Sequence, residues 1–143
     1  MVIDVGADAI DRPSIQGGGY TVLSLDNPAN DHGVIDMIEI FAKQDINDLI
    51  VGTFSLVNGT TYQCRDSELI GGGFSGSKHT FSGLDMEIEK GDIIGAWWRS
   101  GNLAADVSGY AGVMHAVGMH INKGDQAVYT LLDGHALSLC GIG

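Results

Sequence analysis

The chain has 143 residues, of which 17% are charged and 44% hydrophobic, so it is long enough to form one domain with its own core. A net charge of −11 argues against nucleic-acid binding, which requires a basic surface. The apolar stretches are too short for a transmembrane helix, and no signal peptide is visible, so we expect synthesis and folding in a cytoplasm.

The first 18 residues read as an N-terminal arm that precedes a single domain at residues 19–143. Val2, Ile3, Val5 and Ile10 make this segment too apolar for a free tail. We interpret it as an arm that packs either on the chain's own sheet or on a neighbouring subunit.

The next segments predict β-strands separated by turns. Tyr20–Leu25 is the first clear strand, and an Asp- and Asn-rich turn follows it. Val34–Phe41 also reads as a strand, because it is rich in β-branched residues and lacks the polar face of a surface helix. Gln44–Asp48 is the one place where a short helical turn would fit.

A β-hairpin is the strongest local prediction in the chain. Leu49–Val57 and Thr60–Arg65 read as two strands, and Asn58-Gly59 between them is the preferred dipeptide of a type I′ turn.

The pattern M-x-I-x-K-G-D occurs twice, at Met86–Asp92 and again at Met119–Asp125. In both copies an alternating strand is expected to enter a Lys-Gly-Asp turn that leads into a new apolar run. Similar units in two halves of a chain are typical of antiparallel sandwiches and jelly rolls.

The remaining strands complete an all-β prediction. Glycine is frequent and proline rare, with 22 and two residues, which favours many tight turns. We predict an antiparallel β-sandwich, jelly-roll-like, with about eight or nine strands. The later strands are expected at Leu84–Glu89, Ile93–Arg99, Val113–His120, Ala127–Leu132 and His135–Cys140.

The sequence contains no recognisable catalytic motif, so we expect a protein that is not an enzyme and needs no cofactor. His115 and His120 are five apart, and on one strand they would point to opposite faces, so no metal site is predicted. Two acidic clusters, near Asp4–Asp11 and Asp26–Asp31, lack the spacing of a calcium loop. Cys64 and Cys140 are interpreted as two buried free thiols rather than a disulfide.

Trp97-Trp98 is the most pointed feature outside the repeated pattern. Adjacent strand residues face opposite sides, so one indole should enter the core while the other faces outward or toward a partner. Burial of both, in a sandwich that is apolar on both sides of the strand, is the competing interpretation.

The strand and Gly-Asp turn pattern of Leu84–Trp98 resembles the jelly-roll domains of viral and phage structural proteins, such as capsid decoration (cement) proteins and tail-fibre domains. This resemblance implies an acidic, oligomeric virion subunit, with a trimer favoured, that is made in the host cytoplasm. Its partners would be further copies of itself and a capsid or other structural protein, with no nucleic acid and no membrane.

The leading hypothesis is therefore a non-enzymatic structural or assembly subunit. The alternative is a carbohydrate-binding module or adhesin-like domain on an extracellular surface, with Trp97, Trp98, Arg99 and Tyr110 as its stacking platform. The candidate interface residues are Val2, Ile3, Val5, Ile10, Trp97, Trp98, Arg99 and Tyr110.

Overall fold

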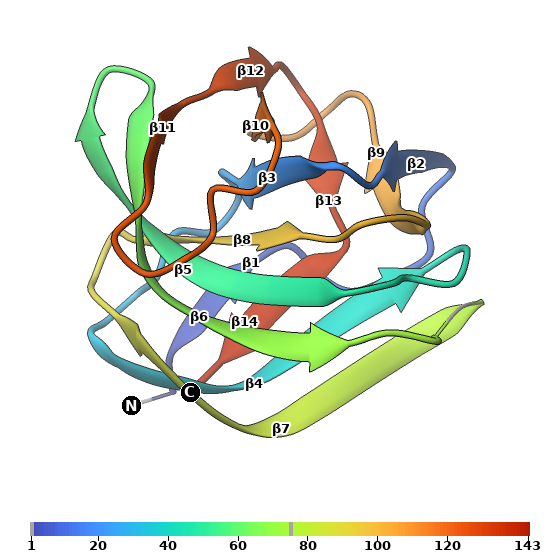
Figure 1. The fold of residues 1–143 in the computed structure, drawn as a ribbon, viewed down its shortest axis with the longest axis horizontal. Helices are drawn as coiled ribbons and strands as arrows, with labels where there is room; N and C mark the ends of the chain where they lie inside the picture. Colours follow the sequence, from blue (N-terminus) through green and yellow to red (C-terminus); the bar gives the residue numbers. More distant parts are fainter. Residues whose placement is uncertain (1, 75) are drawn as a thin grey trace.

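The computed structural model describes residues 2–74 and 76–143, and these residues form two antiparallel β-sheets (Figure 1). The predicted all-β sandwich is confirmed. The described residues contain 14 strands, more than the eight or nine expected. The excess arises because the arm contributes two short strands, because Asn102–Asp106 forms a strand within a segment expected to be a polar loop, and because two long C-terminal segments are each divided by a single residue, Tyr129 or Ser138.

The first sheet, called sheet A here, is centred on β4. This long strand pairs with β14 along one side and with β7 along the other, while its last residue pairs with β9. The strands of sheet A are β1 (Asp4–Gly6), β2 (Ser14–Gly17), β4 (Gly33–Ala42), β7 (Ser77–Ile88), β9 (Asn102–Asp106), β13 (Ala136–Leu137) and β14 (Leu139–Ile142).

The second sheet, sheet B, curls into a nearly closed small barrel. Its strands lie in the order β11-β6-β5-β8-β3-β10-β12, and only Tyr129 separates the two end strands in the chain. The segment of residues 126–132 therefore joins the two edges of the sheet, which Figure 1 shows as a continuous path beside β6 and β10. The strands are β3 (Tyr20–Ser24), β5 (Leu49–Asn58), β6 (Thr61–Gly71), β8 (Ile93–Trp97), β10 (Val113–Val117), β11 (Gln126–Val128) and β12 (Thr130–Leu132).

Two apolar cores follow from this arrangement. The larger core lies between the sheets and contains Ile38, Ile94 and Trp98, while the smaller one contains Leu23 and Phe54 on the other face of sheet B. β8 is therefore buried on both faces. This explains why its sequence is a nearly continuous apolar run instead of an alternating one.

At Gly95 in the middle of β8, an added methyl group would lie 2.5 Å from Leu23 and 2.8 Å from Phe54. Only glycine leaves room for the barrel interior at this position.

The N-terminal arm packs on its own sheet. β1 pairs with β14, and β2 pairs with β9, so both strands belong to sheet A. Ile3 and Val5 are buried in the larger core, with 6% and 0% of their surface exposed. The arm therefore packs on the chain's own sheet, which is the first of its two interpretations.

Both copies of the repeated pattern form the same four-residue turn. In the first, the Asp92 side chain accepts the N–H of Glu89, and the Asp92 N–H donates to the Glu89 carbonyl oxygen. Asp125 and Asn122 make the same two bonds in the second copy. The turn glycines, Gly91 and Gly124, have φ of +90° and +92°, a region that favours glycine.

The two turns flank the same part of β6. Arg65 donates to both carboxylate oxygens of Asp92 from the first turn, at 2.5 and 3.2 Å. The neighbouring residue, Cys64, exchanges backbone hydrogen bonds with Gly124 and Asp125 of the second turn. The repeated pattern therefore supplies two similar supports for one strand of the barrel.

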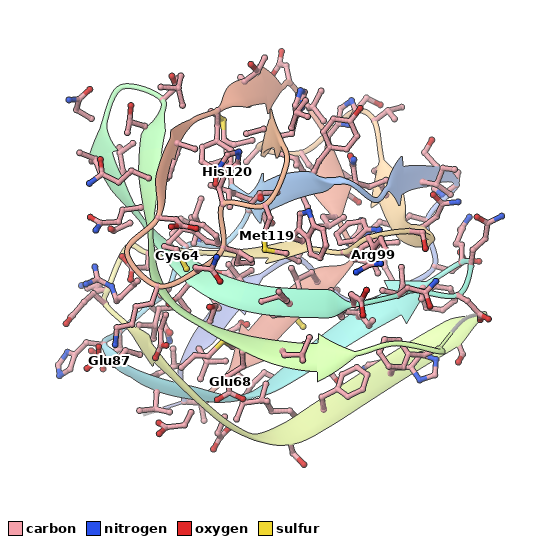
Figure 2. All side chains as sticks on the ribbon, in the orientation of Figure 1. Cys64, Glu68, Glu87, Arg99, Met119 and His120 are labelled. Atoms are coloured by element: carbon pink, nitrogen blue, oxygen red, sulfur yellow. The ribbon has the colours of Figure 1, made fainter. Side chains whose placement is uncertain are left out.

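Acidic side chains join the two sheets along the edge where β6 meets β7. Asp66 accepts the backbone N–H of Glu87 at 3.0 Å, and Glu68 accepts that of Asp85 at 2.7 Å; Figure 2 labels Glu68 and Glu87 on these strands. These bonds satisfy N–H groups of β7 that face away from β4, so the edge strand is partly capped.

Three local predictions were wrong in detail. The hairpin is present, but β5 includes Asn58, and the two connecting residues are Gly59 and Thr60, with positive φ at Gly59 alone. That is the pattern of a type II′ turn. No helical turn forms at Gln44–Asp48, where Ile46 is buried and Asn47 bridges to Ser100.

The strand expected at Val113–His120 ends at Val117, so the second copy of the pattern is not preceded by a strand. Gly118, with φ of +92°, redirects the chain. Met119 and His120 then lie in the segment that crosses the barrel (Figure 2), and Ile121 packs fully buried in the smaller core. In the described residues there is also no helix long and apolar enough to cross a membrane.

Candidate functional site

The two tryptophans are both turned into the molecule. Trp98 is fully buried in the larger core, and its Nε1 donates to the Gly101 carbonyl oxygen at 3.0 Å. Trp97 faces the other side of β8, as alternation predicts, but there it packs partly buried against the smaller core. Because sheet B is apolar on both faces, the outward side of β8 is a barrel interior and not a free surface.

Arg99 lies exposed beyond the end of β8 (Figure 2) and pairs with Asp48 at 2.8 Å. The stacking platform expected from Trp97, Trp98, Arg99 and Tyr110 is therefore not assembled, because Trp98 has no exposed surface. Within the arm, Val2 is 66% exposed, in contrast to the buried Ile3 and Val5.

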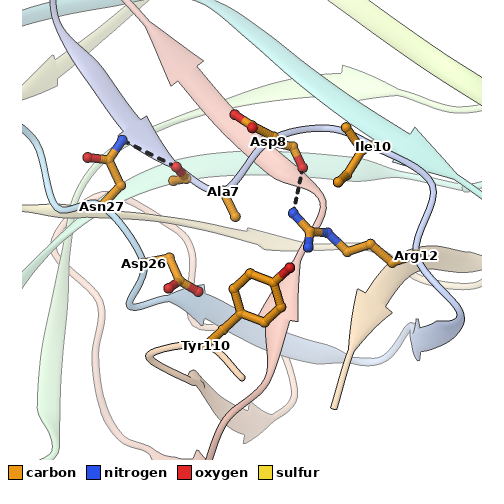
Figure 3. A pocket seen from close by; sticks show the side chains of 8 residues that line it. Ala7, Asp8, Ile10, Arg12, Asp26, Asn27 and Tyr110 are labelled. Carbon is orange, nitrogen blue, oxygen red and sulfur yellow. Dashed lines mark hydrogen bonds between the residues drawn. The ribbon is translucent and has the colours of Figure 1, made fainter. Parts of the chain in front are cut away.

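Two other predicted residues, from distant parts of the chain, do meet. Ile10 of the arm and Tyr110 of the loop after β9 line the same surface hollow, which has a volume of about 330 Å³. They are 50% and 43% exposed. Figure 3 shows the side chains of this hollow, which is lined by Gly6, Ala7, Asp8, Ile10, Arg12, Asp26, Asn27 and Tyr110.

Arg12 fixes one wall of the hollow. Its guanidinium donates to Asp106 at 2.7 Å, to the Ser138 hydroxyl at 2.8 Å and to the Asp8 carbonyl oxygen at 2.9 Å. It also lies over the Tyr110 ring, 5.1 Å from the ring centre. Burial disfavours the charge, but the interactions with Asp106 and Tyr110 outweigh this effect and raise the pKa of Arg12. The side chain is therefore a permanently charged anchor.

Asp26 forms the opposite wall. Its Oδ1 accepts the backbone N–H of Ala111 at 3.0 Å, which ties the loop that carries Tyr110 to the end of β3. Its Oδ2 is inaccessible to solvent and has no hydrogen-bond partner among the described residues. This oxygen is therefore a buried acceptor without a donor, and such an unsatisfied polar atom lowers the stability of the fold.

A second surface feature is a hairpin without charge. Residues 49–64, which form β5, the turn and the start of β6, contain no charged side chain, and neither do residues 126–132. At the end of the hairpin Leu56, Val57 and Val128 are 58%, 45% and 71% exposed. Leu56 pairs with Tyr62, and Val128 pairs with Thr61, so Leu56, Val57 and Val128 all lie near the tip of the hairpin; we call these three residues the hairpin patch.

The cysteines and histidines are the candidates in the sequence for a metal site or a disulfide. Cys64 and Cys140 are buried free thiols, as predicted, and burial raises their pKa values to about 12 and about 11. The described residues hold no cluster of three or more His, Cys, Asp or Glu side chains suited to a metal ion.

Comparison of the chain with protein-family models, curated proteins and solved structures finds no match. The assignment of a function must therefore rest on the geometry of the hollow and of the hairpin patch.

Sequence reasoning selected Ile10 and Tyr110 but missed Arg12 and Asp26. Asp26 was predicted only as part of a turn and of an acidic cluster without the spacing of a calcium loop, and the arginine in the apolar arm was not predicted to be buried. One signal was available, because Arg12 is the only lysine or arginine among the first 42 residues and is surrounded by four aspartates between positions 4 and 26.

Proposed function

We propose that this chain is a non-enzymatic structural subunit that assembles with copies of itself, favouring a trimer, on a virion as a capsid decoration or tail-fibre protein. One observation carries the proposal: the hairpin patch is apolar and exposed on a hairpin that has no charge, in a protein with 18 acidic and seven basic residues.

The distribution of charge limits which surfaces of two copies of the chain can form an interface. Copies with a net charge of −11 repel one another over most of their surface. The hairpin and the strand beside it are the region where two copies approach without bringing acids together. Interface centres are depleted in charged residues and rich in apolar ones, and the hairpin patch has this composition.

The shape of the fold also suits this role. Figure 1 shows the β5–β6 hairpin projecting at the upper left with β11 beside it, away from sheet A. A projecting element reaches a neighbouring subunit more readily than a flat sheet face does. A stable interface must bury about 1,000 Å² or more in total, so flanking parts of the barrel must contribute too.

Sedimentation velocity of the wild-type chain and of Val128→Asp tests the proposal. We expect a concentration-dependent oligomer for the wild type and a monomer for the variant, because the new carboxylate would be buried among apolar side chains. Val117→Asp is the matched control, since Val117 is 76% exposed on β10 and lies outside the hairpin patch. It should assemble as the wild type does.

A wild-type chain that stays monomeric at all accessible concentrations would contradict self-assembly. Equal assembly of the wild type and Val128→Asp would contradict the role of the hairpin patch. The virion part of the proposal has a separate test, because genes for a portal and a major capsid protein should lie beside the gene for this chain.

A further inference from the structure

The molecule has a second exposed apolar surface, at the end of β6 that lies away from the hairpin patch. Leu69 of β6 pairs with Ile50 of β5, and Ile50 pairs with Trp97 of β8, so the three side chains form one row on the same face of sheet B. Leu69 is 69% exposed, while Ile50 and Trp97 are half-buried against the smaller core.

Met119 extends this row (Figure 2). Thr21, which pairs with Trp97, donates its hydroxyl to the Gly118 carbonyl oxygen at 2.8 Å and accepts the His120 N–H at 2.9 Å. These two bonds hold Met119 beside the row, and its side chain is 42% exposed. We call the four residues the barrel-end surface: Ile50, Leu69, Trp97 and Met119.

The charges around the barrel-end surface do not oppose contact with another copy. Arg99 and Asp48, exposed at the same end of sheet B, form an ion pair at 2.8 Å, so their charges offset each other. Glu68 precedes Leu69 in the chain but points to the other face of β6, where its carboxylate accepts the Asp85 N–H.

The symmetry of a trimer requires two different surfaces. The inference rests on the proposed self-assembly, in which each copy in a ring of three contacts the next head to tail. The hairpin patch and the barrel-end surface meet this requirement, because Thr61 and Leu69 lie about 25 Å apart along β6. Figure 1 shows β6 running from the projecting hairpin toward the lower right.

We propose that the barrel-end surface binds the hairpin patch of a second copy of this chain. The interface joins two apolar surfaces and brings no unpaired acid into contact with another, so burial is favourable despite the net charge of −11. Trp97 lies in the centre of the receiving surface, and tryptophan is enriched among the residues that dominate binding energies.

Sedimentation velocity of Leu69→Asp tests the receiving surface. We expect a monomer, because the new carboxylate would be buried against the apolar hairpin patch. Val107→Asp is the matched control, since Val107 is 55% exposed in the loop after β9. It should assemble as the wild type does. Both side chains are exposed, so both variants should keep the far-ultraviolet circular dichroism spectrum of the wild type.

A mixture of two variants distinguishes a head-to-tail interface from one between two hairpin patches. Val128→Asp keeps an intact barrel-end surface, and Leu69→Asp keeps an intact hairpin patch. An equimolar mixture should therefore sediment as a 1:1 dimer, although each variant alone is a monomer.

The possible failures are distinguishable. A wild-type chain that stays monomeric would overturn the proposed self-assembly and this inference with it. Assembly of Leu69→Asp to the wild-type extent would overturn only the inference and leave self-assembly through the hairpin patch intact. A mixture in which both folded variants stay monomeric would likewise overturn the pairing of the two surfaces.

Discussion

Asp92 and Asp125 occupy the same position in the two copies of the repeated pattern, yet their surroundings differ. Both cap the turn that precedes them, but Asp92 is only 5% exposed and also binds Arg65. Asp92 raises the pKa of Arg65, chiefly by accepting a hydrogen bond from its side chain. The repeat therefore provides two aspartates with the same local role and different tertiary roles.

Replacement of each aspartate by alanine separates these roles. Asp92→Ala should lower the free energy of unfolding by about 2–3 kcal/mol, because it leaves Arg65 and the Glu89 N–H without an acceptor. Asp125→Ala loses only the turn bond and should cost about 1 kcal/mol. Urea denaturation of both variants measures the difference, and equal losses would show that the ion pair adds nothing.

The Cys64 thiol should make the protein less stable in alkali. Burial raises its pKa to about 12 from an ordinary value of 9.0. Below pH 9 the thiol is protonated in both states, and its contribution to stability is fully present. Between about pH 9 and 12 the unfolded chain loses the proton while the folded chain keeps it, so stability falls.

The free energy of unfolding of Cys64→Ala, measured by urea denaturation from pH 7 to pH 11, should decline less steeply than that of the wild type. Burial also raises the pKa of Tyr129, so some of the decline remains in the variant. Identical slopes in the two proteins would contradict a buried thiol.

At the scale of the element, the arm is part of the sheet that it covers. β1 adds a strand beside β14, and the Ile3 N–H and carbonyl oxygen bond to Gly143. Its alternation of exposed and buried residues, with Val2 outside and Ile3 and Val5 inside, follows from this pairing. The arm is consequently unavailable as a clamp on a neighbour without leaving its own core.

Two valines of the arm provide a matched test. Val5→Ala should cost about 2 kcal/mol, because it leaves a cavity in the larger core. Val2→Ala removes a side chain that is 66% exposed and should change stability by less than about 0.5 kcal/mol. Thermal denaturation distinguishes the two. A stable Val5→Ala variant would mean that the arm is only loosely attached.

Local patterns predicted elements well where one face of a strand is buried or where turn chemistry is specific. Val34–Phe41 is a strand, and the β5–β6 hairpin is present although its turn is shifted by one residue. Strand ends were less predictable: β10 ends at Val117, directly before Gly118, whose φ is +92°, and this isolated glycine was not interpreted as the end of the strand.

At the scale of the whole molecule, composition and periodicity predicted the fold class but not the barrel. Closure depends on residues 126–132 changing partner at Tyr129, from β6 on one side to β10 on the other. Each half looks like an ordinary strand in the sequence. The hollow was unpredictable for a related reason, since it joins residues about 100 positions apart in the chain.

The change of partner at Tyr129 has a consequence for folding. Until residues 126–132 are in place, β6 and β10 each lack a neighbour on their outer side. Two unpaired strand edges and an uncovered apolar lining make such an intermediate prone to aggregation. Docking of this one seven-residue segment covers both edges together.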